Sequence, residues 1–194
     1  MKFNCILWDF DGVILDSMSL RNHGFEQIFD DYDETKVKKL MDFHLQNGGL
    51  SRYVKIRYFF EEILGEEVSD DKVLRLAMRF SEIMKERLVD SALLIKETVD
   101  FIRENSNDYK MHIVSGSDGN ELRYLCESLD IAKYFRSISG SPTSKIELVS
   151  EVIKGNRYPP NDCVLIGDSK NDFDAARSNN CLLYTSPSPR DKRQ

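Results

Sequence analysis

Near its start the chain carries the sequence WDFDGVILDS, in which an apolar run is followed at once by two aspartates, Asp9 and Asp11. The apolar residues 6–8 predict a strand buried inside a sheet, and Gly12 allows the backbone to turn just past its end. Side chains two residues apart on an extended chain point the same way, so this strand brings both carboxylates into one small volume. Because two like charges repel, both stay ionised only if a cation lies between them.

A second apolar run, residues 163–166, predicts another buried strand that ends in acidic residues. Asp168 lies at the tip of this strand, and Asp172 lies one helical turn further along the chain. Between the two acidic strands, residues 111–114 predict a strand that ends in the hydroxyl of Ser115. In an open parallel sheet, ligands gather outside the carboxyl ends of the strands, so we expect these side chains to converge there.

Two further residues fit an anion site at the same place. Gly116 has no side chain, so an anion can approach its N–H closely. Lys145 begins a helical pattern and would bring a positive charge near the acids. The apolar residues spaced for one buried face of this helix are Ile146, Val149 and Ile153.

These residues resemble, in order, the four motifs of the haloacid dehalogenase-like (HAD) hydrolase superfamily, of the phosphatase and phosphomutase type. The matching segments are Asp9-x-Asp11-Gly12-Val13, Ser115, Lys145 and Gly167-Asp168-Ser169-x-x-Asp172, within a match from about residue 2 to residue 180. The resemblance implies an α/β fold, a Rossmann-like parallel sheet core with an inserted α-helical cap, as in phosphoglycolate phosphatases and β-phosphoglucomutases. It implies a discontinuous catalytic core, residues 1–16 and 88–180, and a cap domain, residues 17–87.

The resemblance also implies roles for the core residues. Asp9 is the expected nucleophile that forms an aspartyl-phosphate, and Asp11 is expected to protonate the leaving alcohol and then take a proton from water. Ser115 and the Gly116 N–H are expected to bind the phosphoryl group, while Lys145 offsets the charge of the acids.

The expected cofactor is Mg²⁺, which prefers oxygen ligands. The resemblance places it on Asp9, the backbone carbonyl of Asp11, and Asp168. Asp172 belongs to the same metal site, where we expect it to orient Lys145 or a metal-bound water rather than to bind the ion directly.

Asp11 indicates which reaction to expect. Members of the superfamily that cleave carbon–halogen or phosphonate bonds lack or replace this second aspartate, so phosphate esters are the expected substrates. We therefore expect Mg²⁺-dependent hydrolysis of a small phosphorylated metabolite. Sugar phosphomutases share all four motifs and remain an alternative, as does a phosphate-binding regulatory module without turnover, against which the intact acids argue. A two-component receiver domain also combines acids, a hydroxyl and a lysine, but it carries its phosphorylated aspartate on a middle strand.

Four segments after the first motif have apolar residues at helical spacing: 17–30, 34–46, 51–64 and 69–87. In the family, a helical cap of this size closes over the active site, where it excludes water and shapes the pocket around the leaving group. Such a lid keeps out most macromolecular substrates.

Within the cap, Arg52 follows a Gly-Gly break at the start of a predicted helix. There it is expected to bind a second anionic group of the substrate, with Lys55 as a weaker candidate. The alternative is a solvated basic helix face that also includes Arg57. Arg21 is a further candidate for substrate binding, since relatives often carry a histidine or arginine near this point of the first cap helix.

Composition limits the other classes. A chain of 194 residues with 41% hydrophobic residues can build a core, and a net charge of −6 without a basic run argues against a nucleic-acid surface. No signal-like or membrane-spanning apolar stretch is present in the sequence. The resemblance implies a small phosphorylated metabolite as the partner, composition argues against nucleic acid and membrane, and the oligomeric state stays open.

The histidines and cysteines carry weaker expectations. His23 and His44 have no metal-ligand neighbours in the sequence, and we expect surface or packing roles for both. Cys5 and Cys163 fall in predicted strands and Cys126 in a predicted helix, which favours buried thiols in a reducing compartment. We therefore expect a cytoplasmic protein.

The last residues, 181–194, resemble one reading frame of a common sequencing adaptor. We expect this segment to be non-native, and the C-terminal part of the core, one more strand and helix in the family, to be missing. The alternative is a genuine Ser/Pro-rich tail. Residues 181–185 are apolar and β-prone enough to occupy an edge position of the sheet.

Overall fold

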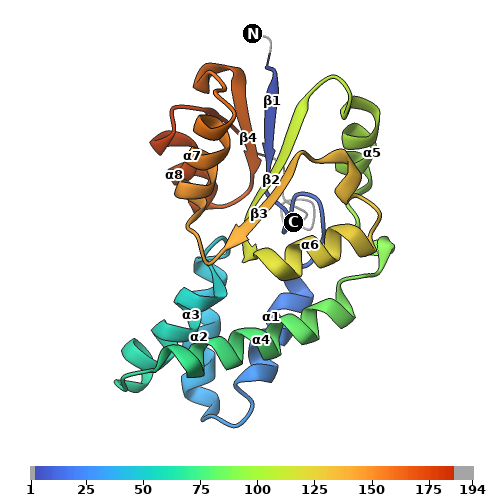
Figure 1. The fold of residues 1–194 in the computed structure, drawn as a ribbon. Coiled ribbons are helices and arrows are strands. Elements are labelled where there is room, and N and C mark those ends of the chain that lie inside the picture. Colours follow the sequence, from blue (N-terminus) through green and yellow to red (C-terminus); the bar gives the residue numbers. More distant parts are fainter. Residues whose placement is uncertain (1–2, 186–194) are drawn as a thin grey trace.

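The computed structural model describes residues 3–185, which form a parallel sheet with helices on both faces and a bundle of helices at one end (Figure 1). Within this part of the chain, five strands form one sheet in the order β3-β2-β1-β4-β5, and all neighbouring pairs are parallel. The strands are β1 (Cys5–Trp8), β2 (Lys110–Asp118), β3 (Ser137–Ser141), β4 (Cys163–Gly167) and β5 (Leu182–Thr185). The expected α/β fold is confirmed.

The three strands predicted from apolar runs are confirmed as β1, β2 and β4, which form the middle of the sheet. Trp8 of β1 lies opposite Ile113 of β2 and opposite Ile166 of β4. β1 and β4 therefore end almost level, and β2 continues past them to Asp118. The residues that follow β1 and β4 and the last residues of β2 meet at one edge of the sheet. The sequence pattern does not predict β3, because its residues, SISGS, contain no apolar run.

Helices cover both faces of the sheet because alternate strand residues point to opposite sides. The helices are α5 (Lys96–Asn105), α6 (Gly119–Ser128), α7 (Lys145–Gly155) and α8 (Lys170–Ser178). Ile6 and Trp8 belong to the apolar cluster that includes α5 and α6, and Cys5 and Leu7 belong to the cluster of α7 and α8 (Figure 1). Cys5, Cys126 and Cys163 are buried free thiols, as predicted.

One detail of α7 differs from the prediction. Val149 and Ile153 are buried as expected, but Ile146 is 39% exposed. Lys145 itself is buried, together with Leu148. Because these residues share one stripe of the helix, the inward-facing lysine rotates Ile146 out toward solvent.

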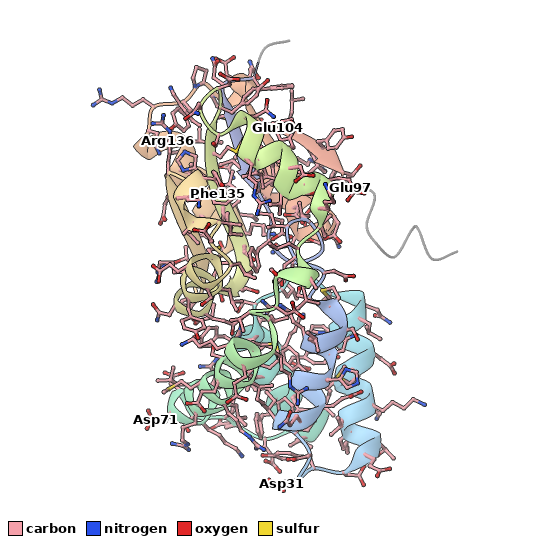
Figure 2. The ribbon with its side chains drawn as sticks, turned by 90° about the vertical axis from the view of Figure 1, so that its right-hand side faces the viewer. Asp31, Asp71, Glu97, Glu104, Phe135 and Arg136 are labelled. Atoms are coloured by element: carbon pink, nitrogen blue, oxygen red, sulfur yellow. The ribbon has the colours of Figure 1, made fainter. Side chains whose placement is uncertain are left out.

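The helical bundle at the end of the sheet contains every helical segment predicted after the first motif. Its elements are α1 (Met18–Ile28), α2 (Glu34–Gln46), α3 (Arg52–Tyr58), the π-helical turn η1 (Phe59–Leu64) and α4 (Asp70–Arg87). We call α1–α4 the cap helices. They extend away from the sheet, with Asp31 and Asp71 at the far end (Figure 2).

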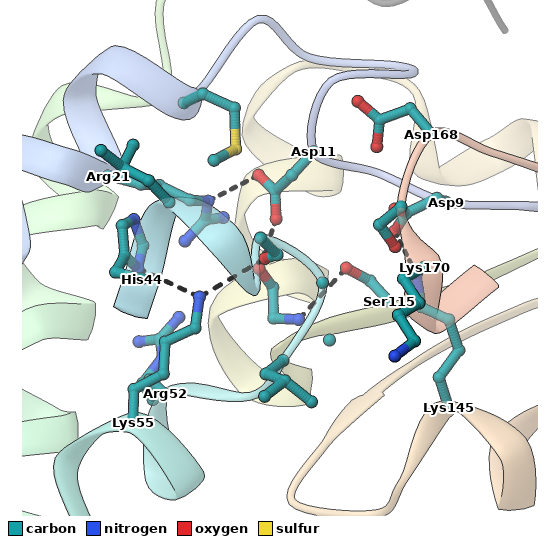
Figure 3. Close-up of a pocket in the computed structure, with 18 of the residues that line it drawn as sticks. Asp9, Asp11, Arg21, His44, Arg52, Lys55, Ser115, Lys145, Asp168 and Lys170 are labelled. Atoms are coloured by element: carbon teal, nitrogen blue, oxygen red, sulfur yellow. Dashed lines mark hydrogen bonds and ion pairs between the residues drawn. The ribbon is translucent and has the colours of Figure 1, made fainter. Parts of the chain in front are cut away.

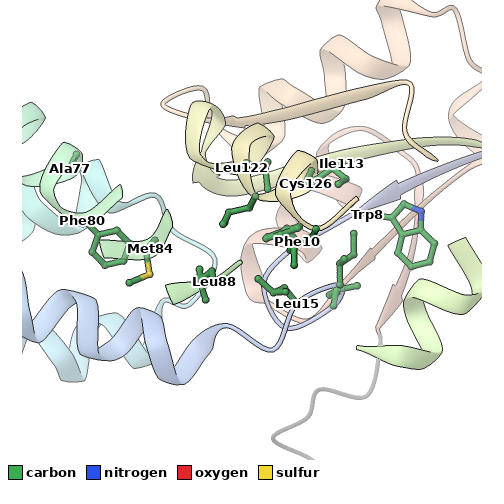
Figure 4. Close-up of a cluster of buried hydrophobic side chains, with 14 of the residues drawn as sticks. Trp8, Phe10, Leu15, Ala77, Phe80, Met84, Leu88, Ile113, Leu122 and Cys126 are labelled. Atoms are coloured by element: carbon green, nitrogen blue, oxygen red, sulfur yellow. The ribbon is translucent and has the colours of Figure 1, made fainter. Parts of the chain in front are cut away.

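A continuous apolar cluster joins the cap helices to the sheet (Figure 4). Phe80 and Met84 of α4 are buried in it, and so is Leu88, which follows α4. On the sheet side, the cluster continues through Phe10 and Leu15. The cap helices therefore pack on the sheet through buried apolar contact.

Two chain segments connect the cap helices to the sheet, and they pair with each other. The Asp16 N–H donates to the Leu93 carbonyl at 2.8 Å, and the Ile95 N–H donates to the Ile14 carbonyl at 2.9 Å. The pairing is antiparallel. The chain therefore leaves and re-enters the sheet part of the molecule at one place, through a paired ribbon.

The strand β5 falls in the tail that the sequence predicts to be non-native. It pairs with β4, so the predicted edge position is confirmed, and residues 186–194 of the tail lie outside the described residues. Across residues 3–185, the helices lack the combination of length and apolar character that crossing a membrane requires.

Candidate functional site

The ends of β1, β2 and β4 open into a cavity of about 200 Å³ that the cap helices cover (Figure 3). Predicted site residues from both parts of the chain line this cavity: Asp9, Asp11, Ser115, Gly116, Lys145 and Asp168 from the sheet part, and Arg21 and Arg52 from the cap helices. The structure therefore brings together residues that lie far apart in the sequence. Asp172, the remaining predicted residue, is fully buried and contacts Lys145.

Lys145 lies between two carboxylates. Its Nζ is 2.9 Å from Asp9 Oδ1 and 2.7 Å from Asp172 Oδ1. Burial by itself would lower the pKa of Lys145, but the two carboxylates outweigh this and raise the pKa above its ordinary value. The lysine is therefore protonated, and it balances part of the negative charge in the site.

Asp9, the first residue after β1, is only 4% exposed. Its Oδ1 accepts a hydrogen bond from the Phe10 N–H at 2.8 Å. Burial and the charge of Asp172 raise the pKa of Asp9 to about 8, against the opposing effect of Lys145. The positive charge of Lys145 is thus too small to keep Asp9 ionised at neutral pH, and an added cation would favour the charged form of Asp9.

Asp11 lies in a different electrostatic environment, although it is only two residues away. Its carboxylate accepts hydrogen bonds from the Ser17 hydroxyl, from the Ser117 hydroxyl at 2.5 Å and from Arg21 Nε at 2.5 Å. Burial would raise the pKa of Asp11, but Arg21 and the two hydroxyls lower it below its ordinary value. The two aspartates therefore have pKa values displaced in opposite directions, a pattern typical of carboxylates with separate chemical roles.

Gly12 lets the loops after β1 and β4 approach each other. Its φ is +80°, and a Cβ at this position would lie 2.7 Å from Asp168 Oδ2. Only glycine accepts both this backbone conformation and this close approach. The turn predicted at Gly12 thus makes room for the third acid beside the first.

Three carboxylates could together hold a metal ion. Asp9, Asp168 and Asp172 each offer an oxygen, and these oxygens lie within 4.8 Å of one another. Such donors fit Mg²⁺. Both oxygens of Asp172 are already engaged, Oδ1 with Lys145 and Oδ2 with the backbone N–H (3.0 Å) and hydroxyl (2.5 Å) of Ser169. This geometry favours Asp9 and Asp168 as ligands and Asp172 as the residue that orients Lys145.

The expected phosphoryl-binding residues, Ser115 and Gly116, lie in the last part of β2 and line the same cavity as the acids. Ser115 is buried, and its hydroxyl accepts a hydrogen bond from the Ser117 N–H at 3.1 Å. A Cβ at Gly116 would collide with the backbone carbonyl of Gly49, which belongs to the loop between α2 and α3. Asn171 Nδ2 donates to the same carbonyl at 2.7 Å. The cap loop therefore rests directly on the site.

The cations of α3 lie inside the cavity. Arg52 is 4% exposed and Lys55 is 2% exposed, so neither belongs to a solvated helix face. The solvated interpretation fits Arg57, which pairs at the surface with Glu61 and Asp70.

The two histidines behave as the sequence predicts. His23 is exposed, and His44 is buried against the ring of Phe25 at 4.6 Å. His44 Nδ1 also accepts from Lys55 Nζ at 3.0 Å, so this packing residue holds a cation that lines the cavity.

Glu121, on α6, is a site residue that the sequence pattern does not identify. Its two carboxylate oxygens bind Arg21 Nη1 at 3.0 Å and Arg52 Nη1 at 2.7 Å. The D-x-x-E spacing from Asp118 to Glu121 marks only a helix start. The arginine partners are 100 and 69 residues away in the chain, so no local pattern contains the contact.

Replacing Lys145 by methionine should destabilise the fold, because the fully buried carboxylate of Asp172 would lose its cationic partner. Breaking a buried ion pair from one side costs about 3–5 kcal/mol, and we expect a loss near the lower end because Asp9 can take up a proton. Chemical denaturation at neutral pH measures this loss, and the exposed Lys154→Met on the same helix is the control. A deficit that does not shrink in acid, where carboxylates are protonated, would contradict this explanation.

Known structures share this fold. CbbY from Rhodobacter sphaeroides, solved in complex with phosphate, has a TM-score of 0.74 at 15% identity, covering 99% of this chain and 89% of that one. β-Phosphoglucomutase from Clostridium difficile has a TM-score of 0.72 at 19% identity, covering 93% and 83%. A predicted phosphoglycolate phosphatase from Haemophilus somnus has a TM-score of 0.70 at 14% identity, covering 99% and 92%. At these identities the likeness establishes the fold.

The family follows from the sequence comparison. No curated protein matches this chain. The family model described as haloacid dehalogenase-like hydrolase matches residues 6–184, which is most of the chain. The match contains every acid, the hydroxyl and the lysine that line or support the cavity. This chain therefore belongs to the haloacid dehalogenase-like hydrolases.

Proposed function

We propose that this protein hydrolyses a small phosphorylated metabolite with the help of Mg²⁺, through an aspartyl-phosphate intermediate on Asp9. The observation that carries the proposal is the pair of aspartates after β1, which differ in partners and in the direction of their pKa shifts. One is held by the cation Lys145, and the other lies among hydrogen-bond donors beneath the cap helices.

In the first step, a carboxylate oxygen of Asp9 attacks the phosphorus atom, and the bond from phosphorus to the ester oxygen breaks. Asp11 donates a proton to that oxygen, so the leaving group departs as an alcohol. In the second step, a water oxygen attacks the phosphorus of the aspartyl-phosphate while Asp11 takes its proton. The bond to Asp9 then breaks, which releases inorganic phosphate and restores both carboxyl groups.

Asp11 must therefore change protonation state during the cycle. Without substrate, its lowered pKa keeps it ionised, which is the form that accepts a proton from water. A phosphate group placed beside it adds negative charge, which raises the pKa and favours the protonated form that the first step needs.

The carboxylates of Asp9 and Asp168 would hold Mg²⁺, which supplies positive charge to the phosphoryl oxygens and favours ionised Asp9. Ser115 donates its hydroxyl to a phosphoryl oxygen, and the Gly116 N–H lies beside it. Lys145 adds a fixed positive charge. The cap loop at Gly49 excludes bulk water from the reacting groups.

The cavity supports a compact, anionic substrate. Its size of about 200 Å³ suits a small metabolite, and Arg21, Arg52 and Lys55 bring positive charge to the side that would receive the leaving group. The acidic protein and its buried free thiols support a reducing, cytoplasmic setting.

A sugar phosphomutase is the second candidate, and the cations on the cap side favour it because they could bind a second phosphate. It would use the same first step, after which a substrate hydroxyl rather than water would attack the aspartyl-phosphate. Release of inorganic phosphate from phosphorylated sugars supports the phosphatase, whereas transfer between sugar hydroxyls supports the mutase.

Hydrolysis of p-nitrophenyl phosphate with Mg²⁺ and with EDTA tests the proposed function. We expect p-nitrophenol release that depends on Mg²⁺, because the acids lack sufficient positive charge without it. Activity that EDTA leaves unchanged would refute a Mg²⁺-dependent mechanism.

Mg²⁺ should stabilise the protein more strongly in mild alkali than in mild acid. In the folded protein Asp9 has a pKa of about 8, whereas the unfolded carboxyl has a pKa of ~4. Between these two pH values the folded protein keeps a proton that the unfolded chain releases. Without a cation, the free energy of unfolding therefore falls as the pH rises from ~4 to about 8. Bound Mg²⁺ displaces this proton, so its apparent affinity should fall about tenfold for each pH unit below that pKa. Thermal unfolding with and without Mg²⁺ measures the effect. A rise in Tm that is independent of pH would show that Asp9 is not a ligand.

A further inference from the structure

Glu121 is a fully buried carboxylate that contacts neither the acids nor the proposed metal ligands. It lies in the first turn of α6, outside the cap helices. Its Oε1 accepts from Arg21 Nη1 at 3.0 Å, and its Oε2 accepts from Arg52 Nη1 at 2.7 Å. These arginines belong to α1 and α3, so one residue of the sheet part holds two separate cap helices.

The four charged groups form a balanced buried chain. Asp11 binds Arg21, Arg21 binds Glu121, and Glu121 binds Arg52. Arg52 also donates to the Ser81 hydroxyl at 2.7 Å. A buried charge is tolerated only when it is paired, so each member depends on its neighbours for its position. Arg21 in particular is fixed from two sides, by the proposed acid–base residue and by Glu121.

Arg21 is held in a way that leaves a donor for a ligand. Its Nε binds Asp11 and its Nη1 binds Glu121. Its Nη2 is buried and has no hydrogen-bond partner among the described residues. Buried donors rarely stay unpaired, and Arg21 lines the cavity, so this atom is placed to meet an acceptor of bound substrate.

We propose that Glu121 is a positioning residue for the phosphatase reaction. It orients Arg21 against Asp11 with Nη2 available to the substrate, and it holds Arg52 at the cap side of the cavity. Glu121 belongs to the sheet part of the molecule, and both arginines belong to the cap helices. Glu121 can therefore orient Arg21 and Arg52 only while the cap helices lie over the sheet. This inference rests on the proposed function.

The test begins with Glu121→Gln, which keeps the shape of the side chain and removes its charge. With p-nitrophenyl phosphate and saturating Mg²⁺, we expect kcat to fall about 10- to 100-fold, a scale that a small misplacement of a catalytic contact can reach. The p-nitrophenyl group carries no anionic group that Arg52 could bind. A change in kcat with this ester therefore reflects the position of Arg21 rather than that of Arg52. In ¹H–¹⁵N spectra, we expect the Arg21 Nε–H signal, assigned with Arg21→Gln, to shift in Glu121→Gln.

Two control variants separate positioning from a general loosening of the structure. Glu127→Gln changes an exposed acid of the same helix and should leave kcat and the Arg21 signal unchanged. Asp118→Asn weakens another contact to the cap helices, the acceptor of the Tyr53 hydroxyl at 2.8 Å, and still permits an N-cap. If Asp118→Asn lowers kcat as much as Glu121→Gln does, loosened closure explains the result and the positioning role is wrong.

A double-mutant comparison completes the test, and it also covers the case in which Glu121→Gln does not fold. Arg21→Gln combined with Glu121→Gln removes one charge of each sign, so the buried chain stays balanced. If Glu121 acts through Arg21, the double variant should be as slow as Arg21→Gln alone, within about threefold. The proposal would be overturned if the fold-reductions in kcat of the two single variants multiplied in the double variant. It would also be overturned if the Arg21 Nε–H signal stayed unchanged in a folded variant that lacks Glu121. If wild-type protein shows no Mg²⁺-dependent hydrolysis, the proposed function fails, and the arginine signal still decides whether Glu121 positions Arg21.

Discussion

Replacing Asp9 by asparagine should abolish turnover and leave the fold intact. An amide cannot form the aspartyl-phosphate, so the covalent route is lost, and in other covalent enzymes such losses reach ~10⁴-fold or more. Stability should stay close to that of wild type, because a pKa raised to about 8 leaves the buried Asp9 carboxyl mostly protonated at neutral pH, and a neutral amide then replaces a neutral carboxyl. Phosphate release from p-nitrophenyl phosphate and thermal unfolding measure the two effects.

The matched control is Asp108→Asn, an exposed aspartate in a turn, which should change neither quantity. Trapping of labelled phosphate on acid-quenched wild-type protein adds a direct readout of the intermediate. Activity of Asp9→Asn within about tenfold of wild type would exclude Asp9 as the nucleophile.

Replacing Asp11 by asparagine should slow the reaction ~10²–10⁴-fold with alkyl phosphates, whose alcohols need a proton to leave. The defect should be much smaller in the first step with p-nitrophenyl phosphate, since p-nitrophenolate leaves without protonation. Burst kinetics with both esters separate the first step from hydrolysis of the intermediate.

With p-nitrophenyl phosphate, the second step of Asp11→Asn should still be slow, because Asp11 also accepts the proton of the attacking water. Arg21 keeps Glu121 as a partner when the Asp11 charge is lost, so the variant should remain folded. An equal first-step defect with both esters would show that Asp11 acts by holding Arg21 rather than by proton transfer.

The sequence predicts those parts of the fold in which local pattern and burial coincide. β1, β2 and β4 are central parallel strands, buried on both faces, and such strands are continuous apolar runs. The edge strand β3 is partly exposed, so it does not need a continuous apolar run, and its polar sequence does not identify it as a strand. Ile146 shows the same limit on a helix, because the buried lysine next to it decides which face turns inward.

The acids of the site are predictable because Asp9 and Asp168 directly follow strands and the other acids come shortly after them. The environments of these acids are not predictable from the sequence. Asp9 and Asp11 are two residues apart, and yet one is held by Lys145 and the other by Arg21. Glu121 is hidden for the same reason, since its meaning depends on two arginines that only the folded chain brings to it. Local patterns identify the reactive groups, and long-range packing determines the charge state and orientation of each.

The paired ribbon that joins the cap helices to the sheet has an evolutionary consequence. Since the chain departs and returns through two segments that hydrogen-bond to each other, the whole cap is an insertion whose ends are adjacent. Insertions with adjacent ends can be lengthened, shortened or exchanged while the host fold remains intact. If the cap residues bind the substrate as proposed, selection can replace them without disturbing the strands that carry the acids, so one reaction can be adapted to different substrates.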